Sequence, residues 1–85
     1  MVTKKITIKI PTGLEARPVA LLVQVASRYE SSVFVECEDK KVNAKSIMGM
    51  MSLGIAAGEE VTVTANGNDE EEAIENIEKY LSSKE

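Results

Sequence analysis

Two short segments of the chain hold residues whose types and spacing could support phosphate chemistry. Residues 13–18 read Gly-Leu-Glu-Ala-Arg-Pro, and residues 43–53 read Asn-Ala-Lys-Ser-Ile-Met-Gly-Met-Met-Ser-Leu. Both segments lie at the predicted start of a helix, where unpaired backbone N–H groups point outward and the helix dipole favours an anion. Both are therefore candidate sites for holding or carrying a phosphate group.

Ser46 is the candidate phosphate acceptor, because it precedes a short apolar run in the position of an N-cap. Phosphorylation would add a charge of about −1.5 to −2 where the helix dipole stabilises it. The new anion would lie beside Ile47, Met48 and Met51, which we expect to form an exposed patch suited to adaptable partner contacts. For Ser46 the alternative is an ordinary cap, worth about 1 kcal/mol. For the three apolar residues the alternative is that they belong to the core.

Arg17 is a second candidate, because its planar guanidinium suits bidentate pairing with an oxyanion. It would bind a carboxylate of a partner or a phosphate on Ser46. The alternative is an ion pair with Glu15, two residues earlier in the chain.

The composition limits the function classes that are open to the chain. It has 85 residues, with 14 acidic and 10 basic side chains, and the net charge of −4 does not favour direct binding to nucleic acid or to anionic membranes. Without a signal-peptide pattern or the roughly 20 apolar residues of a spanning helix, we expect a cytoplasmic protein. With no histidine and one cysteine, we expect no disulfide, metal or other cofactor. Cys37 is predicted to be a small core residue without a function.

Alternating and helical spacings predict the elements that position these segments. The expected order is β-α-β-β-α-β-α, with strands at 5–10, 32–37, 41–43 and 61–65, and helices that begin at Pro18, after Ser46 and after Asp69. Asp69 and Glu72 have the spacing of a capping box. The pattern predicts one α+β domain, residues 1–85, in which an antiparallel sheet carries its helices on one face.

The two segments resemble the signature segments of HPr, the histidine-containing phosphocarrier family of the sugar phosphotransferase system. The likeness spans essentially the whole chain, and residues 45–54 are similar to the version found in Gram-positive bacteria. The resemblance implies an open-faced sandwich, in which a four-stranded antiparallel sheet of order 1-4-2-3 packs against three helices.

Glu15 stands where this family carries the histidine that accepts and passes on a phosphoryl group. Transfer through a phosphoimidazole needs a ring nitrogen that is nucleophilic at neutral pH, and a carboxylate does not supply one. Three roles stay open for Glu15. It is an acyl-phosphate acceptor, a tolerated polar residue near a helix start, or a fixed negative charge that mimics phosphohistidine toward partners.

The change at Glu15 resembles the catabolite repression HPr-like subgroup, which lacks the relay histidine and keeps the regulatory serine. The resemblance implies that HPr kinase/phosphorylase modifies Ser46, and that the modified chain is a corepressor partner of the LacI-type catabolite control transcription factor. It implies a phosphoacceptor rather than an enzyme. Lys45 would help to dock the kinase, with a solvated lysine as the alternative.

The alternative function is a phosphocarrier of the sugar phosphotransferase system, in which Glu15 is a natural or engineered replacement of histidine. Small domains with exposed strand edges can also exchange a terminal strand with a neighbouring copy. We therefore expect a monomer, with a strand-swapped dimer as the minority form.

Overall fold

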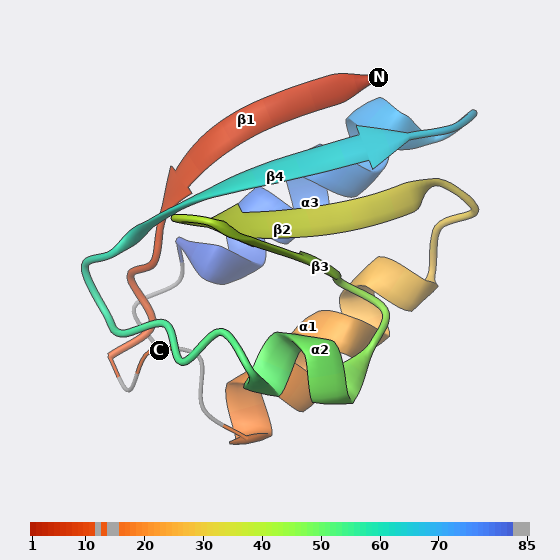
Figure 1. Ribbon diagram of the computed structural model, residues 1–85. Helices are drawn as coiled ribbons and strands as arrows, with labels where there is room; N and C mark the ends of the chain where they lie inside the picture. Colours follow the sequence, from red (N-terminus) through yellow and green to blue (C-terminus); the bar gives the residue numbers. More distant parts are fainter. Residues whose placement is uncertain (12, 14–15, 83–85) are drawn as a thin grey trace.

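The chain folds in the element order predicted from its sequence. The structure is a computed structural model and describes residues 1–11, 13 and 16–82. The elements are β1 (Val2–Thr7), α1 (Ala16–Ser27), β2 (Ser32–Cys37), β3 (Lys40–Asn43), α2 (Ile47–Met51), β4 (Glu60–Asn66) and α3 (Glu70–Leu81). All strand pairs are antiparallel and the sheet order is β1-β4-β2-β3, which confirms the order implied by the resemblance (Figure 1).

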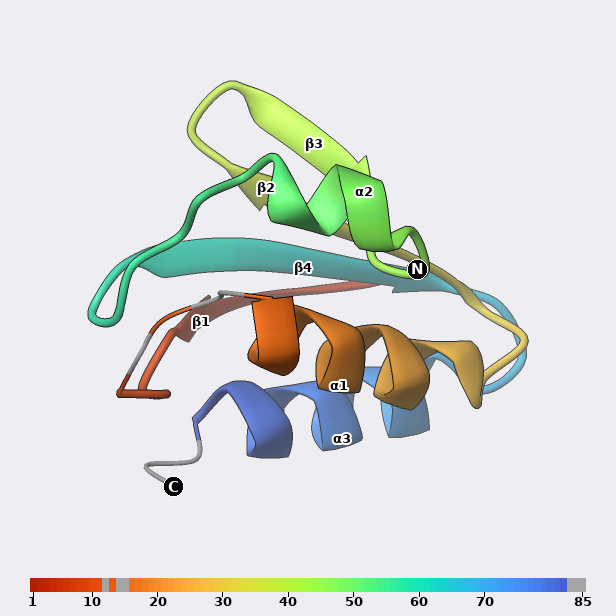
Figure 2. The same cartoon turned by 90° about the horizontal axis from the view of Figure 1, so that it is seen from below.

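The three helices pack on one side of this sheet. Figure 2 shows α1 and α3 lying side by side beneath the strands, while the shorter α2 lies near β3 and one flank of α1. The core between the layers is apolar, and the fully buried side chains include Ile8, Val19, Leu22, Val33, Val35, Met50, Val61, Val63, Ile77 and Leu81. Burial of such side chains supplies the main stabilisation of the fold.

The first strand differs from its prediction, which placed it at 5–10. β1 ends at Thr7, although Ile8 and Ile10 beyond it are buried. Ile8 still exchanges backbone hydrogen bonds with the facing segment, since its N–H donates to the Glu59 carbonyl at 2.8 Å and its carbonyl accepts from Gly58 at 2.8 Å. The period-two pattern therefore reported which residues face the core, and it did not report where the regular ladder ends.

The hairpin between β2 and β3 turns through Glu38 and Asp39, as predicted. Cys37 pairs with Lys40 across this two-residue turn. Glu38 has a φ of 56°, a left-handed conformation that a side chain disfavours. The turn therefore contains a local strain that the sheet around it holds in place.

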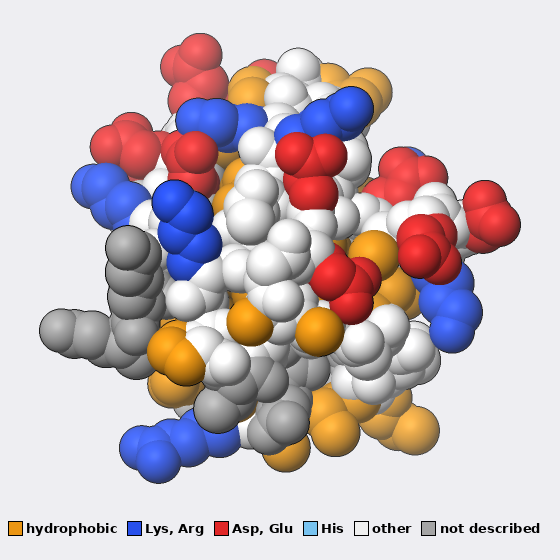
Figure 3. Space-filling view, turned by 90° about the vertical axis from the view of Figure 1, so that its left-hand side faces the viewer, with side chains coloured by type: hydrophobic (Ala, Val, Ile, Leu, Met, Phe, Trp, Pro, Cys, Tyr) orange, Lys and Arg blue, Asp and Glu red, His pale blue; other side chains and the backbone are white. Residues whose placement is uncertain are grey.

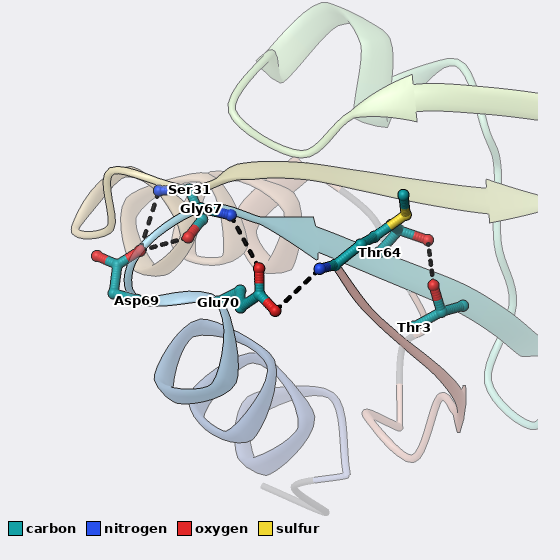
Figure 4. Close-up of polar contacts among 7 residues, drawn as sticks. Thr3, Ser31, Thr64, Gly67, Asp69 and Glu70 are labelled. Carbon is teal, nitrogen blue, oxygen red and sulfur yellow. Dashed lines mark hydrogen bonds and ion pairs between the residues drawn. The ribbon is translucent and has the colours of Figure 1, made fainter.

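The predicted capping box at the start of α3 is wrong. Asp69 is the N-cap residue, but its side chain makes no cap hydrogen bond within the helix. Its carboxylate instead accepts hydrogen bonds from the Glu30 N–H at 2.9 Å, from the Ser31 N–H at 3.0 Å and from the Ser31 hydroxyl. Figure 4 shows Asp69 turned toward Ser31, where it joins the β4–α3 loop to the start of β2.

Glu70, which follows it, supplies a carboxylate to the loop. It accepts a hydrogen bond from the Gly67 N–H at 3.1 Å and pairs with the ammonium of Met1 at 3.0 Å. A Cβ on Gly67 would lie 2.6 Å from the Ser31 Cα, so the close approach of the two segments requires glycine. Asp69 and Glu70 make these hydrogen bonds in place of the capping box that the sequence predicted.

Candidate functional site

Ser46 lies at the N-cap of α2, as its sequence context predicted. The residue is extended, with φ −105° and ψ 114°, and its Oγ accepts a hydrogen bond from the Gly49 N–H at 3.1 Å. Ser46 is half-buried. A Cβ at Gly49 would lie only 3.3 Å from this Oγ, and the glycine therefore keeps the space beside the hydroxyl open.

The short helix α2 is fixed by one buried side chain. Met50 is fully buried, while its N–H donates to the Ser46 carbonyl at 3.0 Å. At the other end the Ser52 hydroxyl donates to the Gly49 carbonyl at 2.6 Å. A five-residue helix has little stability of its own, so packing of Met50 must hold it. Spacing alone does not separate Met50 from its apolar neighbours, because every one of them fits a helical turn.

The remaining apolar side chains of α2 point to solvent. Ile47 is 53% exposed, Met48 is 85% exposed and Met51 is 47% exposed. We call these three residues the apolar patch. In Figure 3 hydrophobic side chains gather along the lower edge of the molecule, where α1 and α2 lie. An exposed apolar surface beside a modifiable serine is suited to recognition by a partner.

Lys45 is held by the protein and is not the solvated lysine that the sequence allowed. Its Nζ donates a hydrogen bond to the Tyr29 carbonyl at 2.7 Å, just beyond the end of α1. Its backbone N–H donates to the Asn43 Oδ1 at 2.8 Å. The predicted role of Lys45 in docking a kinase is untested by these contacts and remains a prediction.

Arg17 lies at the opposite end of α1 from the Lys45 ammonium. It is exposed in the first turn of the helix, whereas the Nζ of Lys45 contacts Tyr29 beyond the last turn. α1 has 12 residues, which corresponds to roughly 18 Å. Pairing of Arg17 with a phosphate on Ser46 remains a prediction. Its other predicted partner, a carboxylate of a second protein, remains a prediction.

The segment before α1 is placed by a close backbone contact. Gly13 is buried with a φ of 73°, and a Cβ there would lie 2.7 Å from the Ile55 carbonyl oxygen. This position requires glycine, and it sets the segment against the loop that precedes β4. Glu15 lies outside the described residues, so the roles predicted for it stay predictions.

Cys37 faces the core side of β2 but is only half-buried at its edge. Its thiol donates a hydrogen bond to the Glu59 carboxylate at 3.8 Å. Burial, followed by the nearby charges of Glu59 and Glu38, raises the pKa of the thiol above its ordinary value of 9.0. A thiol held in its neutral form is a poor nucleophile, and this agrees with a structural role.

Two properties of the described part of the chain bear on other classes of site. None of its helices has the length and apolar character that crossing a membrane requires. Within residues 1–11, 13 and 16–82, no group of three or more His, Cys, Asp or Glu side chains is placed to hold a metal ion.

The sheet order and the helices on one face define the class of small α+β open-faced sandwiches, and comparisons with known proteins give the family. The family described as "PTS HPr component phosphorylation site" matches residues 2–83. The HPr-like protein Crh of Bacillus subtilis is 54% identical over 81 residues, which cover 95% of each chain. This chain belongs to the HPr family.

Two solved structures are similar over almost the whole chain. A crystal structure of HPr-C-His from Thermoanaerobacter tengcongensis has a TM-score of 0.94 at 54% identity, with 99% of this chain and 94% of that chain covered. A crystal structure of Crh, the catabolite repression protein of Bacillus subtilis, has a TM-score of 0.79 at 52% identity, with 99% and 97% covered. That protein is described as an intertwined dimer with a swapped domain.

Proposed function

We propose that this chain is a cytoplasmic regulatory protein of carbon catabolite repression that is switched by phosphorylation of Ser46. HPr kinase/phosphorylase attaches the phosphate, and the modified chain then acts as corepressor partner of the LacI-type catabolite control transcription factor. The observation that carries this proposal is the half-buried Ser46 hydroxyl at the start of α2, directly beside the apolar patch. The similarity to Crh proteins supports the regulatory role.

The geometry of Ser46 supports a switch without a change of fold. The Oγ already lies against the Gly49 N–H at the positive end of α2, where a phosphate is favoured. The buried side chain of Met50 holds the helix in place independently of the hydroxyl. Phosphorylation therefore adds an anion to an existing surface, and a partner reads that anion together with the apolar patch.

The chain contains no histidine, and this supports regulation over phosphoryl relay. Phosphoryl transfer through imidazole has no acceptor here, and Glu15 is the residue at the relay position. We propose that Glu15 and Arg17 contact partners, with the apolar patch as the second contact region.

The direct test is phosphorylation of the purified chain by HPr kinase/phosphorylase and ATP. Mass spectrometry should find one added phosphate on the wild type and none on Ser46→Ala. Ser52→Ala is the matched control, because Ser52 is exposed at the other end of the same helix, and this variant should remain a full substrate. Equal phosphorylation of Ser46→Ala would overturn the proposal.

A second candidate function is a phosphocarrier, favoured by the description of the matching family as a phosphotransferase system component. In that case the chain would take a phosphoryl group from phosphoenolpyruvate through the upstream enzyme. Stable labelling of this chain in such an assay would favour relay over regulation. We expect no labelled product.

For the oligomeric state we propose a monomer with a strand-swapped dimer as the minority form. Both edges of the sheet carry paired lysines, Lys4-Lys5 on β1 and Lys40-Lys41 on β3, and lysines on edge strands oppose pairing between copies. The swapped dimer of Crh supports the minority form. Light scattering should give the mass of one chain for the main species, and a main species of twice that mass would refute a monomer.

A further inference from the structure

We propose that Lys45 is a positioning residue for Ser46, whose ammonium fixes the turn that carries the serine to the end of α1. The inference rests on the proposed function, because positioning matters only if Ser46 is the phosphate acceptor. In this role Lys45 makes a contact within its own chain and does not bind the kinase directly.

The Lys45 ammonium lies just beyond the C-terminal end of α1. The last turn of this helix has no basic residue and Arg28 follows it directly, while helix C-termini leave carbonyl groups unpaired and carry partial negative charge. Lys45 adds a cation from a distant segment, with its Nζ 2.7 Å from the Tyr29 carbonyl. The lysine is half-buried, so this contact is partly shielded from water and is stronger than a fully exposed one.

The same turn is held on its other side by the sheet. Ala44 is fully buried, and its N–H donates to the Val33 carbonyl of β2 at 2.8 Å. The Ser46 N–H donates to the Asn43 carbonyl at 3.0 Å, which closes the turn. Ala44 and Lys45 thus attach the turn to β2 and to the end of α1, and Ser46 follows directly.

A fixed turn is useful to a kinase because phosphoryl transfer depends on alignment of the acceptor hydroxyl with the donor phosphate. When the contact of Lys45 is removed, one of the two attachments is lost and the hydroxyl samples more orientations. The transfer step should then slow, while binding of the kinase to the surrounding surface changes little.

The test compares Lys45→Met, Lys45→Arg and Lys41→Met as substrates of HPr kinase/phosphorylase. Methionine keeps the apolar stem but has no donor, and arginine keeps a charged donor. Lys41 is the matched control, because its ammonium lies 5.2 Å from the Phe34 ring centroid and its loss removes the same charge. All variants are assayed at a temperature at which circular dichroism shows them folded.

Lys45→Met should lower kcat about tenfold, with KM within about twofold of wild type. Lys45→Arg and Lys41→Met should stay within about twofold in both parameters. In the unmodified protein, hydrogen exchange at the Ser46 amide should be about tenfold faster in Lys45→Met than in wild type, because the turn opens more often.

The outcomes separate the inference from the proposed function. If the wild type takes no phosphate on Ser46, the proposed function fails and the inference fails with it. If the wild type is modified and Lys45→Met matches it, only the inference is wrong. A rise in KM with unchanged hydrogen exchange would show direct contact with the kinase, and an equal loss in Lys41→Met would show a general charge effect. Both results would overturn positioning by Lys45.

Discussion

At the scale of single residues, Asp69 joins the start of α3 to the start of β2. Its carboxylate accepts hydrogen bonds from two backbone N–H groups and one hydroxyl across the corner shown in Figure 4. The hydrogen bond from Ser31 and the backbone bond from Glu30 are the main causes that lower the pKa of Asp69 below its ordinary value of 3.8. A lowered pKa means that the folded state favours the ionised carboxylate.

Asp69→Ala should lower the melting temperature by about 5 °C at neutral pH. Because the pKa is lower in the folded state, the contribution of Asp69 is fully present above the unfolded value and declines as pH falls through the folded pKa. The difference between wild type and Asp69→Ala should therefore shrink as pH falls below 3.8. Calorimetry over this pH range checks the result.

Glu71→Ala is the control, since it removes an exposed carboxylate from the same helix turn. It should leave the melting temperature nearly unchanged. A loss as large as that of Asp69→Ala would assign the effect to the helix dipole rather than to the contacts with β2.

Contacts between residues close together in the sequence were predictable, and contacts between residues far apart in the sequence were not. The Ser46 cap was predictable because the hydroxyl bonds to an amide three residues ahead. Lys45 bonds to Tyr29, which is 16 positions away, and Asp69 bonds to Ser31 at 38 positions. Those pairs meet only after the sheet has formed, so local spacing carries no signal for them.

At the scale of elements, α2 depends on a single buried side chain. Met50→Ala should reduce the free energy of unfolding by about 2–5 kcal/mol, because it leaves a cavity under a helix of five residues. Met48→Ala is the matched control and should change that free energy by less than about 0.5 kcal/mol, since its side chain is exposed. Urea denaturation measures both, and similar losses in the two variants would contradict this account of α2.

In the β2–β3 turn, a substitution is expected to raise the free energy of unfolding. Glu38→Gly should increase the free energy of unfolding by about 1 kcal/mol, because glycine adopts the left-handed conformation without steric cost. Asp39→Gly should have no such benefit, since among the described non-glycine residues it is Glu38, and not Asp39, that has a positive φ. Thermal unfolding compares the two, and an equal gain from Asp39→Gly would refute the strain at Glu38.

Element types were predictable from periodicity, whereas some limits were not. The burial of Ile6, Ile8 and Ile10 follows the alternation, yet β1 ends at Thr7 because the next residue, Ile8, bonds to both Glu59 and Gly58 and leaves the regular ladder. The capping box predicted at the start of α3 was wrong because local spacing does not fix the partners of Asp69. A short polar side chain at an N-cap has several acceptors and donors in reach, and the fold decides which of them it meets.

At the scale of the whole molecule, the two candidate partner regions lie on helices that pack against each other. Arg17 is in the first turn of α1, and the apolar patch is on α2, which contacts α1. The two regions can therefore contact one large partner together. The sequence placed both at helix starts and could not show how α1 and α2 pack.

If Arg17 binds a carboxylate of the partner, it does not read the phosphate. Arg17→Ala should leave unchanged the ratio of affinities that the phosphorylated and unmodified chains have for the transcription factor, even if both affinities fall. Sites that share no contacts contribute independently, to within about 0.5 kcal/mol. A ratio that collapses toward one in Arg17→Ala would mean that Arg17 holds the phosphate.

A phosphate on Ser46 should make the surface of α2 competent to bind the catabolite control transcription factor. Isothermal titration calorimetry compares the affinities of the phosphorylated and unmodified chains for that factor. The phosphorylated chain should bind at least about tenfold more tightly, and Met48→Ala should weaken that complex. Equal affinity of the two forms would contradict the account.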